Sequence, residues 1–235
     1  YVNEYIVVPV EESVPAIARS RYIKTSMRKY VEGDFLYVDA DTVWNAPVVE
    51  TDFTHDVMGV LDGHCLLAEH PFKKGIDEDF KKVNYNPGVE QYVNGGVLFS
   101  RDSEVSRKFF DLWHKKWLET SKTGCFIDMP SLNFAFKEIY GKAVSLLPDV
   151  YNCQISRSWK FFARAKLVHF FTGWMEECNE KPYVFQRKSF WELVRKNGLD
   201  DSVVEMLKNP LGAFAIPIEI CDDVDFELKK TAAYG

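Results

Sequence analysis

The chain has 235 residues, of which 46% are hydrophobic and 27% are charged, enough for one large α/β domain or for one domain with a helical extension. Its net charge of −6 argues against nucleic acid as the main partner, although a bound metal can supply the positive charge that a phosphorylated substrate needs. No apolar run approaches the length of about 18 residues that a membrane span requires, and we recognise no signal peptide. We therefore expect a cytoplasmic protein without a transmembrane segment, with peripheral attachment to a membrane left open.

The cysteines are odd in number, scattered, and without Cys-x-x-Cys spacing. This pattern predicts reduced thiols in the core rather than a disulfide framework or a zinc site. The five residues are Cys65, Cys125, Cys153, Cys178 and Cys221.

The first part of the chain predicts a β-helix-β unit. Tyr5–Val10 is predicted to be a strand and residues 16–31 a helix, and Gly33 provides a turn into a second strand, Phe35–Val38. The region 45–90 is rich in glycine, proline and histidine and is predicted to consist mostly of loops. Short strands are possible there at Met58–Leu61 and Cys65–Ala68.

Later elements are marked by capping and turn residues. Val97–Phe99 is predicted as a strand, and Ser103 is a suitable N-cap for a helix that continues through Trp117. Pro130 suits the first turn of a further helix. The remaining predictions are helices at 131–140, 185–196 and 202–207 and strands at 144–147 and 165–170.

The apolar residues Phe35–Val38 are typical of a buried parallel strand. Two carboxylates, separated by one residue, follow where this strand should end, and ligands of open α/β sheets bind at the carboxyl ends of the strands. Side chains two positions apart in an extended segment point the same way, so Asp39 and Asp41 can converge on one cation. Oxygen ligands of this kind suit Mg²⁺ or Mn²⁺. An Asp-rich turn without any ligand would have the same sequence.

Four segments together resemble a known family: Phe35–Thr42, Asn94–Phe99, Asp128–Asn133 and Val168–Gly173. Their order and spacing resemble glycosyltransferases of the nucleotide-diphospho-sugar (GT-A) fold, most closely the family-eight type of glycogenin and bacterial lipopolysaccharide galactosyltransferases. The resemblance extends over residues 5–175. It implies an α/β fold with a mixed central sheet flanked by helices.

The resemblance also implies a hexosyltransferase active in polysaccharide biosynthesis. Such an enzyme transfers a sugar, with retention, from a nucleotide-diphosphate sugar (a UDP-sugar is the usual donor) to a glycan or lipid-linked glycan. Its leaving group is a diphosphate, so Mn²⁺ or Mg²⁺ is the implied cofactor. In similar enzymes a histidine from a late strand completes the metal ligands Asp39 and Asp41, and His169 matches it. A histidine in the core or at a strand end is the alternative.

Other residues match positions that bind the donor or act in catalysis. Asn94-Gly95-Gly96 resembles the loop beneath the donor sugar, where missing side chains let the backbone approach the ring, although a simple turn would also use two glycines. Asp128 matches a carboxylate beside the reacting carbon, whereas a residue favoured by the helix dipole is the alternative. Relatives often have Gln after this Asp. Met129 stands here, which excludes a Gln nucleophile and favours attack from the leaving-group face.

Further donor contacts are implied for Arg21, Lys24 and Ala40. Lys24 matches a basic residue that contacts the donor in relatives, and Ala40 lies between the two aspartates. A solvated basic helix face is the alternative, and it is the fate expected for Arg19, Arg28 and Lys29.

The chain departs from the family pattern at two places. The segment that binds the diphosphate is represented by Gly173, one residue late, and by Lys181, which follows an acidic insertion. Relatives also have two β-helix units before the strand that matches Tyr5–Val10, about 60 residues that we expect to be absent here. That strand should then lie beside the Asp39 strand with an exposed edge.

We expect a GT-A-like catalytic domain over residues 1–175 and a helical extension over 176–235 that packs on it. Two other functions remain open. The segment Asp39–Val43 also fits a haloacid-dehalogenase-type phosphatase, for which Asp222 and Asp223 would be the later acidic pair. A non-catalytic module that binds sugar nucleotides or glycans is the third possibility.

Overall fold

The computed structural model divides the chain into two units, each with its own sheet and core. Unit 1 comprises residues 1–37 and 53–147, and unit 2 comprises residues 38–52 and 148–235. Residues 3–85, 88–139, 141, 143–171, 179–216, 218–219 and 229–230 are described. Both units contain helices and strands, as the predicted mixed α/β class requires.

Unit 1 is built on a mixed sheet. Its strands, in the order β1-β4-β3-β5, are β1 (Phe35–Val38), β4 (Val93–Ser100), β3 (Val57–Leu61) and β5 (Val144–Leu146). β3 pairs antiparallel with β4 and parallel with β5. β4 is buried at every position, as a central strand should be, whereas β1 is half-buried at all four positions because it is the edge strand of this order.

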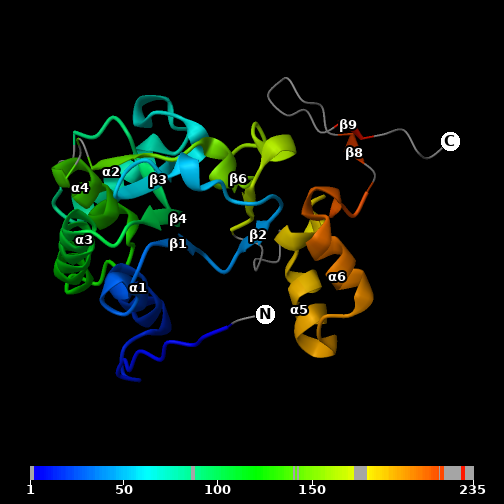
Figure 1. Ribbon diagram of the computed structural model, residues 1–235, viewed down its shortest axis with the longest axis horizontal. Coiled ribbons are helices and arrows are strands. Elements are labelled where there is room, and N and C mark those ends of the chain that lie inside the picture. Colours follow the sequence, from blue (N-terminus) through cyan, green and yellow to red (C-terminus); the bar gives the residue numbers. More distant parts are fainter. Residues whose placement is uncertain are drawn as a thin grey trace. The chain divides into compact units, whose positions relative to one another are not determined.

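Helices pack on this sheet through large apolar side chains. They are α1 (Ala16–Ser26), α2 (Lys73–Lys82), α3 (Glu104–Ser121) and α4 (Met129–Ile139), with 3-10 turns η1 (Met27–Lys29), η3 (Asp62–His64) and η4 (Leu67–Glu69). α3 begins as predicted, since Ser103 Oγ accepts a hydrogen bond from the Ser106 N–H at 3.1 Å. α3 and α4 lie side by side (Figure 1), and Phe109, Trp113 and Leu132 from these helices are fully buried in one core cluster.

Unit 2 contains a smaller sheet, ordered β2 (Thr42–Trp44), β7 (Leu167–His169) and β6 (Cys153–Gln154). β2 is antiparallel to β7, and β6 is parallel to it. The predicted C-terminal helices are α5 (Lys188–Asn197) and α6 (Asp201–Lys208), with 3-10 turns η2 (Glu50–Asp52), η5 (Asp149–Tyr151), η6 (Phe162–Arg164), η8 (Val184–Gln186) and η9 (Pro210–Gly212). Phe170 stacks on Trp191, so α5 shares a core with the end of β7. A separate pair, β8 (Ile218–Glu219) and β9 (Lys229–Lys230), is antiparallel.

Two predicted strands are wrong. Tyr5–Val10 has no regular secondary structure, and Tyr5 and Val7 are 80% and 88% exposed. A strand needs a partner for its backbone groups; within the described residues no strand pairs with this segment, and Pro9 lacks an N–H donor. Cys65–Ala68 instead leads into the 3-10 turn η4, so its apolar residues do not form a ladder.

The expectation of a solvated Arg28 is also wrong. This side chain is buried, and its guanidinium donates to the Gly33 carbonyl at 2.7 Å and pairs with the Asp102 carboxylate at 2.7 Å. Gly33 has a positive φ of 72°, a conformation that glycine adopts without strain. Arg28 therefore fixes the turn that leads into β1.

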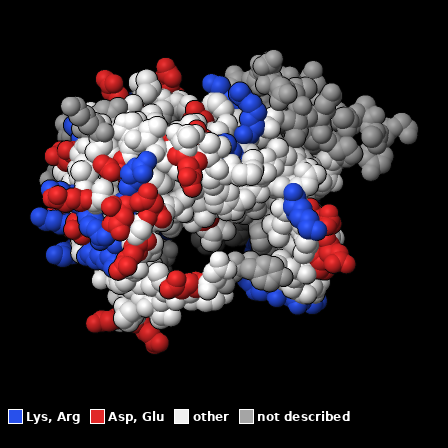
Figure 2. Space-filling model, in the orientation of Figure 1, with Lys and Arg blue, Asp and Glu red and all other residues white. Residues whose placement is uncertain are grey.

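The surface is charged but locally neutralised. Figure 2 shows acidic and basic side chains interspersed over the helices of unit 1, and several form pairs one helical turn apart, such as Lys73–Asp77 and Lys108–Glu104. Among the described residues, no helix has both the length and the apolar composition of a membrane span. Cys65, Cys125 and Cys153 are free thiols, and burial raises the pKa of Cys153 to about 12; Cys178 and Cys221 lie outside the described residues.

Two glycine substitutions test the packing of unit 1. A Cβ at Gly59 would lie 2.6 Å from Val93 Cγ1 and 2.9 Å from Leu98 Cδ2, so Gly59→Ala should lower the free energy of unfolding by about 1–3 kcal/mol. Gly75 in α2 has no atom within 4 Å of its Cβ position, so Gly75→Ala should be neutral or stabilising by about 0.5–1 kcal/mol. Urea denaturation of both variants provides the measurement, and equal effects would contradict the packing described for β3.

Candidate functional site

The predicted metal-ligand aspartates lie on the turn that joins β1 to β2. Thr42 Oγ1 donates to the Asp39 carbonyl at 2.8 Å, and the Phe170 N–H donates to the Asp41 carbonyl at 2.9 Å. β2 and β7 pair so that Thr42 stands opposite His169. The ladder therefore brings the aspartate turn next to the end of β7, entirely within unit 2.

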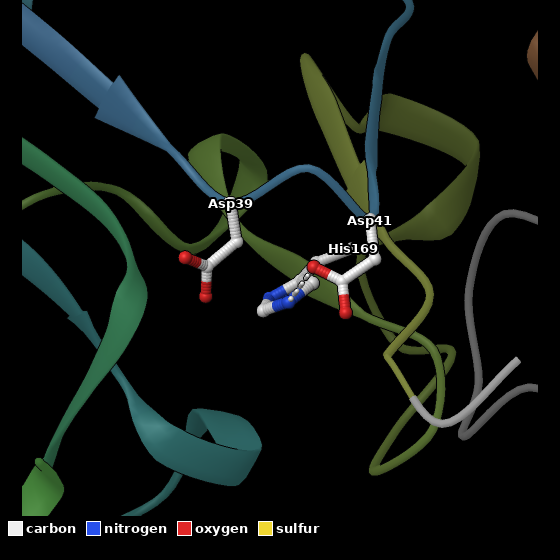
Figure 3. A group of neighbouring side chains, drawn as sticks. All are labelled: Asp39, Asp41 and His169. Atoms are coloured by element: carbon white, nitrogen blue, oxygen red, sulfur yellow. Dashed lines mark ion pairs between the residues drawn. The ribbon is translucent and has the colours of Figure 1, made fainter. Parts of the chain in front are cut away.

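The three predicted ligand side chains converge. One ligand atom from each of Asp39, Asp41 and His169 lies within 4.8 Å of the other two, and His169 Nε2 is 3.3 Å from Asp41 Oδ1. Figure 3 shows the Asp41 carboxylate directed toward the imidazole ring, with the Asp39 carboxylate on the other side of the ring. His169 is only 3% exposed, whereas the aspartates are half-buried. The group is thus open on its acidic side and closed around the histidine.

The hydrogen bonding of His169 fits a metal ligand. Nδ1 lies 2.9 Å from Asn152 Oδ1, and an amide oxygen only accepts, so Nδ1 bears a proton and, in the neutral ring, Nε2 has a free lone pair. Nε2 is buried and has no hydrogen-bond partner among the described residues. A lone pair that faces the Asp41 carboxylate is unfavourable unless a cation lies between the two atoms. An imidazole nitrogen together with carboxylate oxygens is a donor set suited to Mn²⁺. In metal sites the other ring nitrogen of the histidine commonly donates a hydrogen bond, as Nδ1 does here to Asn152.

Asp128, the predicted catalytic residue, lies in unit 1 immediately before α4. It is 4% exposed. Its backbone carbonyl accepts hydrogen bonds from Trp113 Nε1, Ser131 Oγ and the Leu132 N–H at 2.8–3.2 Å. These bonds fix the backbone of Asp128 and so limit the positions that its carboxylate can occupy.

Two predicted donor-binding cations reach this carboxylate from α1. Arg21 Nε is 2.9 Å from Asp128 Oδ1, and Lys24 Nζ is 3.5 Å from Oδ2. Lys24 is buried and also lies over the Tyr37 ring at 5.3 Å, whereas Arg21 is one-third exposed. The alternative of a solvated basic helix face therefore does not apply to Lys24. Two cations on one carboxylate leave a locally positive group.

The Asn94-Gly95-Gly96 segment forms a bulge of β4 rather than a turn before it. Gly59 pairs with Leu98 but the next residue, Val60, pairs with Asn94, so three residues of β4 are inserted in the ladder. Asn94 Oδ1 accepts the Gly96 N–H at 2.8 Å within the bulge.

At Gly95 the backbone of β4 lies close to Asp128 and its partners Arg21 and Lys24, which we call the Asp128 group. A Cβ at this position would be 3.3 Å from Leu132 Cδ2, 3.5 Å from Lys24 Nζ and 3.6 Å from Asp128 Oδ2. The Gly95 N–H donates to Met129 Sδ at 3.2 Å. Arg21, Lys24, Asp128 and the bulge, predicted separately, thus lie together in unit 1.

The remaining predicted donor-binding residues are less informative. Ala40 is exposed on the aspartate turn. Lys181 is exposed, and its carbonyl accepts a hydrogen bond from Arg187 Nε at 2.6 Å. Gly173 lies outside the described residues.

Sequence reasoning missed three residues of these groups. They are Asn152, which orients His169; Met129, which accepts the Gly95 N–H; and Asp62, whose Oδ1 accepts from Asn94 Nδ2 at 2.8 Å. The sequence offered only a weak signal for Asn152, a polar residue between Tyr151 and Cys153.

Comparison with known proteins supports the fold. No protein-family model and no curated protein sequence matches the chain. Among solved structures, the galactosyltransferase LgtC, in complex with donor and acceptor sugar analogues, aligns with a TM-score of 0.50 and 16% identity over 78% of this chain and 69% of its own. The predicted GT-A fold is thereby confirmed.

Two further structures are more distant. The bifunctional glycosyltransferase WbbM aligns with a TM-score of 0.45 and 15% identity over 83% of this chain and 37% of its own. Mouse xyloside xylosyltransferase 1 aligns with a TM-score of 0.39 and 11% identity over 64% and 62% of the two chains. At these TM-scores neither supports a conclusion.

A double-mutant cycle tests the ion pair between Lys24 and Asp128. Because both side chains are buried, we expect Lys24→Met and Asp128→Leu to show a coupling energy of about 1–3 kcal/mol in urea denaturation. The control cycle uses Lys73 and Asp77, an exposed pair one turn apart in α2, which should couple by about 0.5 kcal/mol or less. Equal coupling in the two cycles would show that burial does not strengthen the Asp128 pair.

Proposed function

We propose that this chain is a metal-dependent hexosyltransferase, which transfers a sugar from a nucleotide-diphosphate sugar to a hydroxyl group of a glycan or lipid-linked glycan. The fold supplies the reaction class by analogy only. The observation that carries the proposal is the buried Nε2 of His169, which has no hydrogen-bond partner among the described residues and faces the carboxylate of Asp41 while Asn152 holds the other ring nitrogen.

Asp39, Asp41 and His169 would hold Mn²⁺ or Mg²⁺. When bound, such a cation neutralises the charge that develops on the departing diphosphate. The protein contributes the orientation: Asn152 keeps the His169 lone pair on Nε2, and the β2–β7 ladder holds the aspartate turn beside the ring. Ala40, on the same turn, would leave the backbone accessible to the diphosphate, and Lys181 and Gly173 remain candidates for binding it.

The Asp128 group would bind the sugar. Its carboxylate would accept hydrogen bonds from sugar hydroxyls, and the ion pairs with Arg21 and Lys24 hold it in place. The backbone of Gly95 and Gly96, beside this carboxylate, would lie beneath the sugar ring. Met129 offers only a weak thioether acceptor, already bonded to Gly95, so no side chain at that position can form a covalent intermediate. A retaining reaction would then proceed by attack on the face of the leaving group.

Product analysis separates this proposal from its rivals. The purified chain is incubated with Mn²⁺ and a panel of sugar nucleotides, and release of nucleoside diphosphate is measured. We expect release from a UDP-sugar that depends on the metal and increases when a glycan acceptor is added. Protection against heat without turnover would indicate a binding module, and phosphate release from p-nitrophenyl phosphate would indicate a phosphatase. Either result would replace the proposal.

Metal binding gives a test that does not need the substrate. Alanine at Asp39, Asp41 or His169 should abolish Mn²⁺ binding in titration calorimetry, and Asn152→Ala should weaken it about 10- to 100-fold by releasing the imidazole. Asp201→Ala, an exposed residue on α6, is the control and should bind as the wild type does. Full Mn²⁺ affinity in all four site variants would contradict the assignment.

Asp128 is tested by separating binding from rate. Asp128→Asn keeps the size of the side chain but removes its charge, so contacts that strengthen in the transition state are lost while donor binding largely remains. We expect kcat to fall by about 10²-fold and the donor Kd, measured by calorimetry, to change by less than about threefold. Parallel losses in both would make Asp128 a positioning residue, and unchanged activity would remove it from the site.

A further inference from the structure

A chain of buried polar groups runs from the loop after β3 to the bulge of β4, all within unit 1. Its side chains are Asp62 in η3, His70 after η4, and Asn94 in β4. Asp62 and His70 are each 4% exposed and Asn94 is 8% exposed, so these groups are largely shielded from bulk water. Buried polar side chains of this kind need protein partners, and each of them has one here.

The donor and the acceptor can be assigned for each hydrogen bond that links these polar groups. The Phe72 N–H donates to His70 Nδ1 at 3.1 Å, so Nδ1 is the unprotonated ring nitrogen. The proton of the neutral ring is therefore on Nε2, which donates to Asp62 Oδ2 at 3.0 Å. His70 thus links a backbone N–H to a carboxylate and can do so in one tautomer only.

The second half reaches the bulge. Asn94 Nδ2 donates to Asp62 Oδ1 at 2.8 Å, which fixes the orientation of the amide. The amide oxygen of Asn94 then points back and accepts the Gly96 N–H at 2.8 Å. His70 is two hydrogen bonds away from Asn94 and three from the bulge backbone.

The missing side chain of Gly63 leaves room for the imidazole ring of His70. The φ of Gly63 is 66°, and a Cβ at this position would lie 3.0 Å from His70 Nε2 and 3.2 Å from Cδ2. The ring of His70 therefore occupies the space that a side chain at position 63 would take. The loop is built around the contact between His70 and Asp62.

We propose that His70 is a positioning residue for the donor sugar: through Asp62 it holds the amide of Asn94, and with it the Gly95–Gly96 backbone, in the conformation that receives the sugar. Gly95 and Gly96 have no side chains with which to hold themselves, so the conformation of the bulge depends on Asn94. The inference rests on the proposed function, because it assigns the bulge to the sugar half of the donor.

Two substitutions at position 70 separate the two hydrogen bonds of the ring. In His70→Gln the amide nitrogen reaches the place of Nε2 and can still donate to Asp62, but the acceptor for Phe72 is lost. In His70→Asn the amide oxygen takes the place of Nδ1 and can still accept from Phe72, but the donor to Asp62 is lost. Both variants remove the ring, so they lose similar packing and differ in the link to the bulge.

The first readout is kinetic. We expect His70→Asn to lower kcat/KM for the sugar nucleotide by about 10- to 100-fold. The Kd of the nucleoside diphosphate should stay unchanged, because that ligand lacks the sugar that is transferred. His70→Gln should stay within about threefold of the wild type. The control is Ser106→Ala, which removes a buried hydroxyl bonded to Ser100 at the other end of β4 and should lower stability without this kinetic split.

The second readout needs no substrate. Amide hydrogen exchange of the segment 93–100 should be faster in His70→Asn than in His70→Gln or the wild type. Equal exchange and equal kinetics in the two position-70 variants would overturn the inference. If the wild-type chain uses no sugar nucleotide at all, the proposed function fails, and the exchange rates alone then decide whether His70 holds the bulge.

Discussion

The close approach between the backbone of β4 and the Asp128 carboxylate is the constraint on which unit 1 depends. A Cβ at Gly95 would lie 3.3 Å from Leu132 Cδ2, so the missing side chain lets β4 pack on α4 without displacing that leucine. Asn133 of α4 secures the approach from the other side, since its amide accepts the Val93 N–H and donates to the Val93 carbonyl. Within the interruption of the β3–β4 ladder, the Gly95 N–H donates to Met129 Sδ and the Gly96 N–H to Asn94 Oδ1, as buried backbone groups require.

Much of this architecture could be predicted from local sequence. Ser103 caps α3, and the four ordered segments lead to the correct fold. The extent of β4 was underestimated because Asn94-Gly95-Gly96 has turn composition, whereas the tertiary contacts of Gly95 make it a bulge inside a strand. Tyr5–Val10 failed for the opposite reason: its composition suits a strand, but strand formation also needs a neighbouring backbone, which composition does not report.

The polar residues that organise the candidate site were harder to foresee. Asn152 and His70 act through partners far away in sequence or around a tight loop, and no spacing rule connects Asn152 with His169. Arg28 differs from Arg19 and Lys29 in that the Gly33 carbonyl and the Asp102 carboxylate accept its guanidinium. A single sequence shows the residue types that can ligate or donate, whereas their pairing is decided by the tertiary structure.

The β2–β7 ladder has a consequence for the thermodynamics of unit 2. Asp41 and His169 belong to segments separated by all of the later part of unit 1, so their meeting closes a very long loop of chain at a large entropic cost. A cation held by both segments would act as a crosslink that exists only in the folded chain. Its binding would stabilise the folded chain, and this stabilisation would increase with metal concentration. A site that serves the leaving group would then also hold the two distant segments of unit 2 together.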